Sequence, residues 1–121
     1  MSRYYTEDHE WIDVDGNTAT VGITKHAADE LGEVVYVDLN DVDDTIDKGD
    51  ELGSVESVKT VSGIYAPVTG TITAVNDTLE SNPEKLNEDP EGSAWLVKLS
   101  IENPEDLDSL LSESEYKATI S

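Results

Sequence analysis

The fold of this 121-residue chain is decided by Gly53–Ser62, whose sequence reads GSVESVKTVS. Two short runs of strand-like composition, 51–58 and 60–66, meet at Lys59, so a hairpin would place this lysine at or near its tip. Glu56 is the one acid close to it in the chain. An exposed lysine on a hairpin is ordinarily a solubilising residue. These residues alone therefore predict an accessible lysine and leave its chemistry open.

Short strands separated by turns continue on both sides of this hairpin. Asp15-Gly16 is a two-residue hairpin signal between the runs 10–14 and 18–23. Three more strands are predicted over 32–40, 70–75 and 94–101. In the first of these, one face is expected to carry Val35, Val37 and Leu39. Residues 76–91 are polar and contain two prolines, which predicts a surface loop with one helical turn.

Two short helices complete the pattern. Thr24 can cap a helix over 25–31, with Gly32 just past its end. Pro104 opens a predicted C-terminal helix whose buried face is marked by Leu107, Leu110 and Leu111. Many short strands with two short helices predict a mainly β fold, a compact antiparallel sandwich or barrel, in a single domain spanning residues 1–121.

The charge balance is extreme. Seven basic residues oppose 28 acidic ones, for a net charge of −21. Such a surface repels nucleic acid and anionic membranes, because contacts to phosphate need Lys and Arg. The acids are spread along the whole chain, and there are few lysines, one arginine and no phenylalanine. We therefore expect a halophilic protein, since salt at about 1 M reduces the screening length to about 3 Å.

The sequence also limits the cellular setting. It contains no cysteine, so disulfides, thiolate nucleophiles and cysteine-bound metals are excluded. The first residues form no apolar signal core, and no stretch approaches the length of a transmembrane helix. A cytoplasmic protein without membrane or nucleic-acid partners is expected.

Signals for catalysis are weak. Of the two histidines, His26 falls in the first predicted helix and is expected to be solvated or partly packed. His9 lies in the sequence Glu7-Asp8-His9-Glu10, whose side chains would alternate between the faces of a strand. We therefore predict no metal site. The chain has no G-x-S-x-G nucleophile motif and no glycine-rich phosphate-binding fingerprint.

The stretch around Lys59 resembles the lipoylation site of the glycine cleavage system H protein family. The similarity covers nearly the whole chain in order, which is far more specific than one lysine motif. The matching segments are Asp8-His9-Glu10-Trp11, Val21-Gly22-Ile23-Thr24, Ala27, the block from Leu31 to Val37, Ala66-Pro67-Val68-Thr69-Gly70, Val75-Asn76, Leu86-Asn87, the stretch from Gly92 to Trp95 and the ending from Leu107 to Tyr116.

The resemblance implies a lipoyl-type barrel-sandwich hybrid with short helices, including a C-terminal helix. It implies that Lys59 carries lipoate as an amide at an exposed hairpin. Glu10 matches a family carboxylate that contacts the aminomethyl amine when the loaded arm docks on the carrier. Asp8 replaces a frequent serine near that contact and is retained as a second docking residue. Gly63 replaces an aspartate of some members, so no role is transferred to it.

The family's biochemistry implies a carrier rather than an enzyme. Its lipoyl arm takes the aminomethyl group of glycine from glycine decarboxylase (P protein) to an aminomethyltransferase (T protein). Dihydrolipoyl dehydrogenase (L protein) then reoxidises the arm. A lipoate ligase or a lipoyl/octanoyl transferase would attach the cofactor, and a monomer is expected.

Four other interpretations remain at this point. A biotinyl domain shares the fold, but its hairpin typically places methionine beside the lysine, and the chain's methionine is Met1. A lipoyl domain of a 2-oxoacid dehydrogenase would usually continue into a linker and a large catalytic domain. The protein could also be a lipoate relay that donates lipoyl groups to other enzymes, or an unmodified interaction module.

Overall fold

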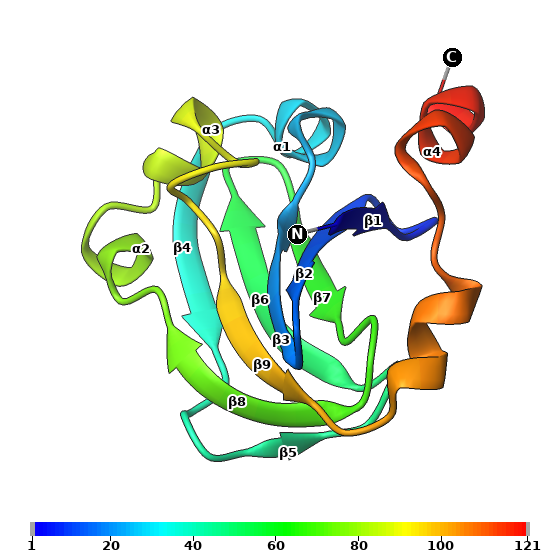
Figure 1. The fold of residues 1–121 in the computed structure, drawn as a ribbon. Helices are drawn as coiled ribbons and strands as arrows, with labels where there is room; N and C mark the ends of the chain where they lie inside the picture. Colours follow the sequence, from blue (N-terminus) through cyan, green and yellow to red (C-terminus); the bar gives the residue numbers. More distant parts are fainter. Residues whose placement is uncertain (1, 121) are drawn as a thin grey trace.

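Two antiparallel sheets face each other in this computed structural model, which describes residues 2–120 (Figure 1). The larger sheet contains, in spatial order, β1 (Ser2–Tyr5), β2 (Glu10–Asp15), β3 (Thr18–Ile23), β9 (Val97–Ile101), β8 (Gly70–Val75) and β5 (Thr45–Ile46). The smaller sheet contains β4 (Val34–Leu39), β6 (Glu51–Ser57) and β7 (Val61–Tyr65). The mainly β prediction is confirmed.

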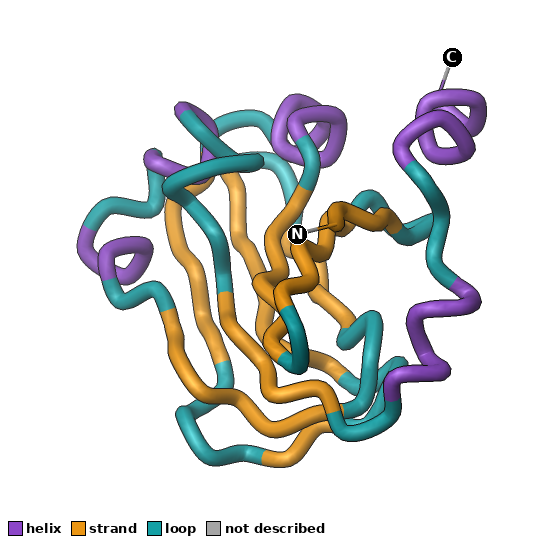
Figure 2. The backbone as a smooth tube through the Cα atoms, in the orientation of Figure 1, coloured by secondary structure: helices purple, strands orange, loops and turns teal. Residues whose placement is uncertain are grey.

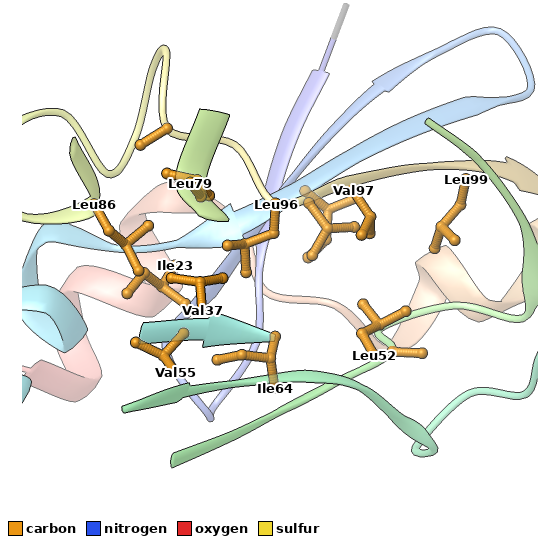
Figure 3. Packing of buried hydrophobic residues seen from close by; sticks show 14 of the residues in the cluster. Ile23, Val37, Leu52, Val55, Ile64, Leu79, Leu86, Leu96, Val97 and Leu99 are labelled. Atoms are coloured by element: carbon orange, nitrogen blue, oxygen red, sulfur yellow. The ribbon is translucent and has the colours of Figure 1, made fainter. Parts of the chain in front are cut away.

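The core lies between the inner faces of the two sheets (Figure 3). Val97 and Leu99 point into it from the larger sheet, and Val37, Val55 and Ile64 from the smaller one. Every second residue of β9 is buried, as expected for a strand with one face on a core. Burial of apolar side chains from both sheets is the main force holding the sandwich together.

The first helix forms where the sequence predicts it. In α1 (Lys25–Leu31), the Thr24 hydroxyl accepts a hydrogen bond from the Ala27 amide at 3.3 Å and caps the N-terminus. Gly32, at φ +78°, ends the helix. Residues 76–91 differ from the prediction, because they form two helical turns, α2 (Thr78–Ser81) and α3 (Lys85–Glu88). Each turn buries one leucine, so this surface loop closes one end of the core; the leucines are Leu79 and Leu86.

The predicted C-terminal helix is two separate elements (Figure 2). A 3-10 helix, η1 (Pro104–Ser109), ends where Leu110 adopts extended backbone, and α4 (Glu113–Ile120) follows. Leu111 pairs with Tyr5 through backbone hydrogen bonds of 2.7 and 2.8 Å. This pairing breaks the leucine pattern that suggested one continuous helix. It also docks α4 beside β1, where the Tyr5 and Tyr116 rings stack with centroids 4.7 Å apart.

Three strand predictions need correction. In β4 a register shift between Val34 and Tyr36 turns Val34 and Val37 inward and leaves Val35 42% exposed, so the predicted shared face is wrong. The β2–β3 loop is Gly16-Asn17, one residue later than expected, with Gly16 at φ +61°. The last strand, β9, begins at residue 97 rather than 94. Strands β1 and β5 were not predicted from the sequence.

Trp11 fixes the start of β2, the strand that carries Glu10. Its indole is buried and donates a hydrogen bond of 2.8 Å to the Pro90 carbonyl. Trp11 pairs with Gly22 on the neighbouring strand β3, and a Cβ at Gly22 would lie 2.5 Å from the indole ring. Any larger residue at position 22 would therefore displace Trp11, and with it the beginning of β2.

Among the described residues, no helix has both the length and the apolar character needed to cross a membrane.

Candidate functional site

The hairpin between β6 and β7 presents Lys59 at its tip, as predicted. The Ser57 amide donates a 2.8 Å hydrogen bond to the Thr60 carbonyl, which leaves Val58 and Lys59 as the loop. The Ser57 hydroxyl oxygen accepts hydrogen bonds from the amides of Lys59 and Thr60, both at 3.2 Å. Ser57 is itself buried, so the lysine extends from a firmly held backbone.

The Lys59 side chain is exposed and crosses the end of α1. Its Cε lies 3.1 Å from the point where a Cβ on Gly32 would be, so Gly32 leaves space for the lysine stem. No carboxylate within residues 2–120 lies within 4.0 Å of its ammonium. Lys25, by contrast, pairs with Asp29 at 2.9 Å. The amine of Lys59 is therefore accessible and unpaired in a strongly acidic protein.

A cavity of about 280 Å³ begins beside the hairpin. Three segments line it: the turn before β2, helix α1 and strand β7. They contribute Asp8, His9, Ile23, Ala27, Glu30, Leu31 and residues 60–64. The lining residues that are buried, Ile23, Leu31 and Ile64, are apolar, and Asp8 and Glu30 are exposed, which suits a long flexible arm with an apolar end.

Glu10 is buried at the first position of β2, with 2% of its surface exposed. One carboxyl oxygen accepts a 2.8 Å hydrogen bond from the Tyr65 amide, and the other accepts one of 3.1 Å from the Thr6 hydroxyl. Burial raises the pKa of Glu10 to about 7, although both hydrogen bonds act in the opposite direction. The charge of Asp8 adds a smaller increase to this pKa.

Glu10 lines a second cavity, of about 370 Å³, together with parts of the β1–β2 turn, β7 and η1. Asp8 lines both cavities and is exposed at the boundary between them. Strand β7 runs past both, since residues 60–64 line the first and Tyr65 lines the second. The structure therefore brings Asp8 and Glu10 together in the second cavity, and Asp8 also reaches the cavity that begins at the Lys59 hairpin.

Gly63 lines the first cavity midway along β7. A Cβ at this position would lie 3.0 Å from the Tyr65 hydroxyl and 3.2 Å from a carboxylate oxygen of Glu51. Tyr65 and Glu51 thus take up the space in which a side chain at position 63 would begin. Acidic character on this rim is supplied instead by Asp8 and Glu30.

The sequence did not identify the partners of Glu10. Tyr65 acts through its backbone amide, which no side-chain pattern reveals. Thr6 reaches Glu10 across a turn, so neither helical nor strand periodicity predicts their contact. The expected strand alternation at residues 7–10 is wrong, because 7–9 form a turn with His9 at φ +67°. His9 leaves that acidic cluster and meets His26 instead, with ring centroids 4.6 Å apart.

Residues 3–121 match the sequence model of the family described as Glycine cleavage H-protein. The chain belongs to this family. A glycine cleavage system H protein from Dinoroseobacter shibae is 55% identical over 119 residues, which cover 98% of each chain. One from Staphylococcus haemolyticus is 52% identical over 96% of this chain and 92% of its own.

The crystal structure of a glycine cleavage system H protein from Mycobacterium marinum has the same fold. Its TM-score is 0.90 at 38% sequence identity, over 98% of this chain and 96% of that one. This match confirms the barrel-sandwich fold expected from the resemblance. H proteins are lipoate-carrying proteins and not enzymes, so family membership assigns this chain a carrier role in the glycine cleavage system.

Proposed function

We propose that residues 1–121 form one lipoyl-carrier domain, monomeric in solution, with lipoate joined to Lys59 through an amide. The observation that carries this proposal is the unpaired amine of Lys59 on a backbone held by Ser57. Amide formation needs a neutral amine that an attaching enzyme can reach. An ammonium paired with a carboxylate would lose its proton less readily and would be harder for the enzyme to reach. The Lys59 ammonium has no such partner among residues 2–120.

When attached, the lipoyl group would supply a disulfide that accepts the aminomethyl group of glycine from the P protein and yields it to the T protein, before the L protein reoxidises the dithiol. Family membership implies these three partners. A lipoate ligase or a lipoyl/octanoyl transferase is the proposed attaching enzyme. The exposed apolar side chains beside the lysine, Val58 and Val61, support contact with such enzymes at the tip.

Glu10 and Asp8 are the proposed docking residues for the loaded arm. Glu10 lies at the far end of β7 from Lys59, in the second cavity, and Asp8 lines both cavities between the hairpin and Glu10. A carboxylate near a protonated amine forms a charge-assisted hydrogen bond, and the low exposure of Glu10 protects that bond from water. With a pKa of about 7, Glu10 would lose its proton when such a cation binds beside it.

Intact mass spectrometry tests the attachment. The native chain is expected to gain the mass of one lipoyl group under lipoate-replete growth, whereas Lys59→Arg gains none, because a guanidinium does not form this amide. Lys25→Arg is the matched control, since Lys25 is also exposed and the variant keeps Lys59. A native chain without the increment, or an increment that survives Lys59→Arg, contradicts the proposed site.

The carrier role is tested with the lipoylated protein and the P protein. Exchange of the carboxyl carbon of glycine with bicarbonate should rise with carrier concentration and be absent with Lys59→Arg. If the lipoylated chain does not stimulate exchange but donates its lipoyl group to other enzymes, the relay function holds instead. A chain that does neither is an interaction module.

A further inference from the structure

Two imidazoles and a carboxylate from distant parts of the chain meet beside α1, at the edge of the first cavity, which His9 and Glu30 line. One ligand atom from each of His9, His26 and Glu30 lies within 4.8 Å of the other two. His26 and Glu30 are one turn apart on α1, and the His26 Nε2 is 3.0 Å from a Glu30 oxygen. His9 reaches them from the turn before β2. His9 and Glu30 also line the first cavity, but the docking residues proposed above are Glu10 and Asp8 and include none of these three side chains.

The backbone holds His9 in place against this helix. Its positive φ of +67° is uncommon for a residue other than glycine. Its carbonyl accepts a 2.9 Å hydrogen bond from the amide of Thr24, the residue that caps α1. Because this bond joins the turn to the start of the helix, the backbone itself places the His9 ring beside His26.

A buried tyrosine orients the His9 ring. The Tyr116 hydroxyl lies 2.8 Å from His9 Nδ1 and 2.8 Å from the Thr24 hydroxyl. In the tautomer with a proton on Nδ1, His9 donates to Tyr116, and Tyr116 donates to Thr24. The Nε2 lone pair of His9 is then free. Metal-binding histidines are commonly held in this way by a second partner on the other ring nitrogen.

Against the expectation from the sequence, we propose that His9, His26 and Glu30 form a binding site for a divalent transition-metal ion of the zinc type. Two imidazoles and one carboxylate favour Zn²⁺, Co²⁺ or Ni²⁺ over Mg²⁺ and Ca²⁺, which prefer oxygen ligands. Three protein ligands leave a fourth position for water. The proposal does not depend on lipoylation of Lys59.

Small side-chain movements would complete the coordination. Zinc bonds of about 2.0–2.1 Å place tetrahedral ligand atoms about 3.3 Å apart. The His26–Glu30 pair is already at 3.0 Å, so the largest adjustment lies between these two side chains and His9. Glu30 has 64% and His26 34% of its side chain exposed, which leaves both free to rotate toward a cation. The net charge of −21 adds a general attraction for cations, from which a specific site must be distinguished.

Cobalt titration of the full chain tests the site, with millimolar Mg²⁺ present to occupy the general acidic surface. Any attached lipoyl group is kept as its disulfide, so that no thiol competes. We expect saturable one-to-one binding, with visible absorption stronger than that of aqueous Co²⁺ and displaced by Zn²⁺. In NMR spectra, Zn²⁺ should shift the ring signals of both His9 and His26.

Two substitutions on α1 form a matched pair. Glu30→Gln and Asp29→Asn each remove one carboxylate, from side chains with 64% and 65% exposure. Zinc affinity should fall by more than about tenfold in Glu30→Gln and in His26→Gln, and by less than about twofold in Asp29→Asn. Tyr116→Phe should weaken binding by about 10–100-fold through the orientation of His9.

Thermal melts of each variant establish that it is folded. His26→Gln changes a partly exposed side chain, so it tests the ligand set even if Tyr116→Phe unfolds the chain. Cobalt that keeps the spectrum of its aqueous ion overturns the proposal. Equal losses of affinity in Asp29→Asn and Glu30→Gln also overturn it, because the cation would then be held by the acidic surface as a whole.

Discussion

Lys59 and Glu10 lie near opposite ends of β7, and the protein holds them in opposite ways. Lys59 is exposed, and no carboxylate among the described residues pairs with its ammonium. Glu10 is buried, and both of its carboxyl oxygens are hydrogen-bonded. Only the backbone of Lys59 is held, whereas the side chain of Glu10 is held by two other segments. One region presents an accessible amine at the surface, and the other buries a carboxyl group whose pKa is raised to about 7.

This contrast separates function from stability. A substitution of Lys59 should abolish modification and leave the free energy of unfolding within about 0.5 kcal/mol, as is usual for exposed sites. A substitution of Glu10 should change stability in a way that depends on pH, because burial sets its pKa. The predictions below test whether burial is what makes the two regions differ.

Salt should have the largest effect. Going from about 1 M to about 0.01 M KCl lengthens the screening distance from about 3 to about 30 Å. The carboxylates that give the net charge of −21 then repel one another more strongly. We expect the melting temperature to fall by roughly 10 °C, equivalent to a few kcal/mol for a chain of this size. The same melts test the expected halophilic character, and an unchanged melting temperature contradicts it.

The pKa of Glu10 should respond much less to the same change in salt. Desolvation is the main cause of the raised pKa, and mobile ions do not screen desolvation. Only the smaller contribution of Asp8 is electrostatic repulsion. Side-chain NMR titration in low and high salt measures this pKa directly. A fall of more than about one unit in molar KCl would mean that general acidity, and not burial, sets Glu10 apart.

Glu10→Gln should have the next largest effect. The pKa of Glu10 is raised in the folded state from an ordinary 4.5 to about 7, so the folded chain binds this proton more tightly. Stability from this group is therefore present at low pH and is lost as pH rises through about 7. Glutamine keeps an acceptor oxygen and does not titrate. Relative to the native chain, the variant should gain on the order of 2–3 kcal/mol between pH 4 and pH 8.

Urea unfolding at the two pH values measures this difference. Glu7→Gln is the control. Glu7 is exposed in the turn just before β2, and the substitution removes the same charge as Glu10→Gln. Its difference from the native chain should stay nearly constant between the two pH values. If both variants show the same pH dependence, Glu10 does not titrate as a buried group, and the contrast with Lys59 is lost.

Local sequence signals predicted the Lys59 region well. The strands of its hairpin, the cap at Thr24 and the helix stop at Gly32 depend on residues close together in the chain, and each formed as expected. The role of the lysine was a different matter. Composition and spacing indicated only an acid-poor lysine, and the similarity along the whole chain was needed to suggest lipoate.

The Glu10 region could not be predicted in the same way, because its geometry depends on segments far apart in the chain. Glu10 takes a hydrogen bond from the backbone of Tyr65, 55 residues away. Tyr116 meets His9 and Thr24 from α4, which follows the pairing of Leu111 with Tyr5 that interrupts the expected C-terminal helix. Such pairings depend on how the sheets and termini pack, and no short pattern encodes them.

Ser57→Ala should have the smallest effect and tests how firmly the lysine is presented. The substitution removes the oxygen that accepts from the amides of Lys59 and Thr60, at an expected loss of about 1 kcal/mol. Ser57 is buried, but the two amides belong to the exposed residues Lys59 and Thr60 and can bond to water instead, so the cost should stay well below that of an unpaired buried group.

Ser54→Ala is the matched control on the same strand, since the described structure gives the Ser54 hydroxyl no hydrogen bond. Urea unfolding measures the stability of each variant. The rate of lipoylation by a purified ligase measures how readily the Lys59 amine is modified. We expect slower modification in Ser57→Ala alone, because a mobile loop presents the amine in many orientations. Equal rates in both variants would mean that exposure of Lys59 suffices and that its rigid base contributes nothing.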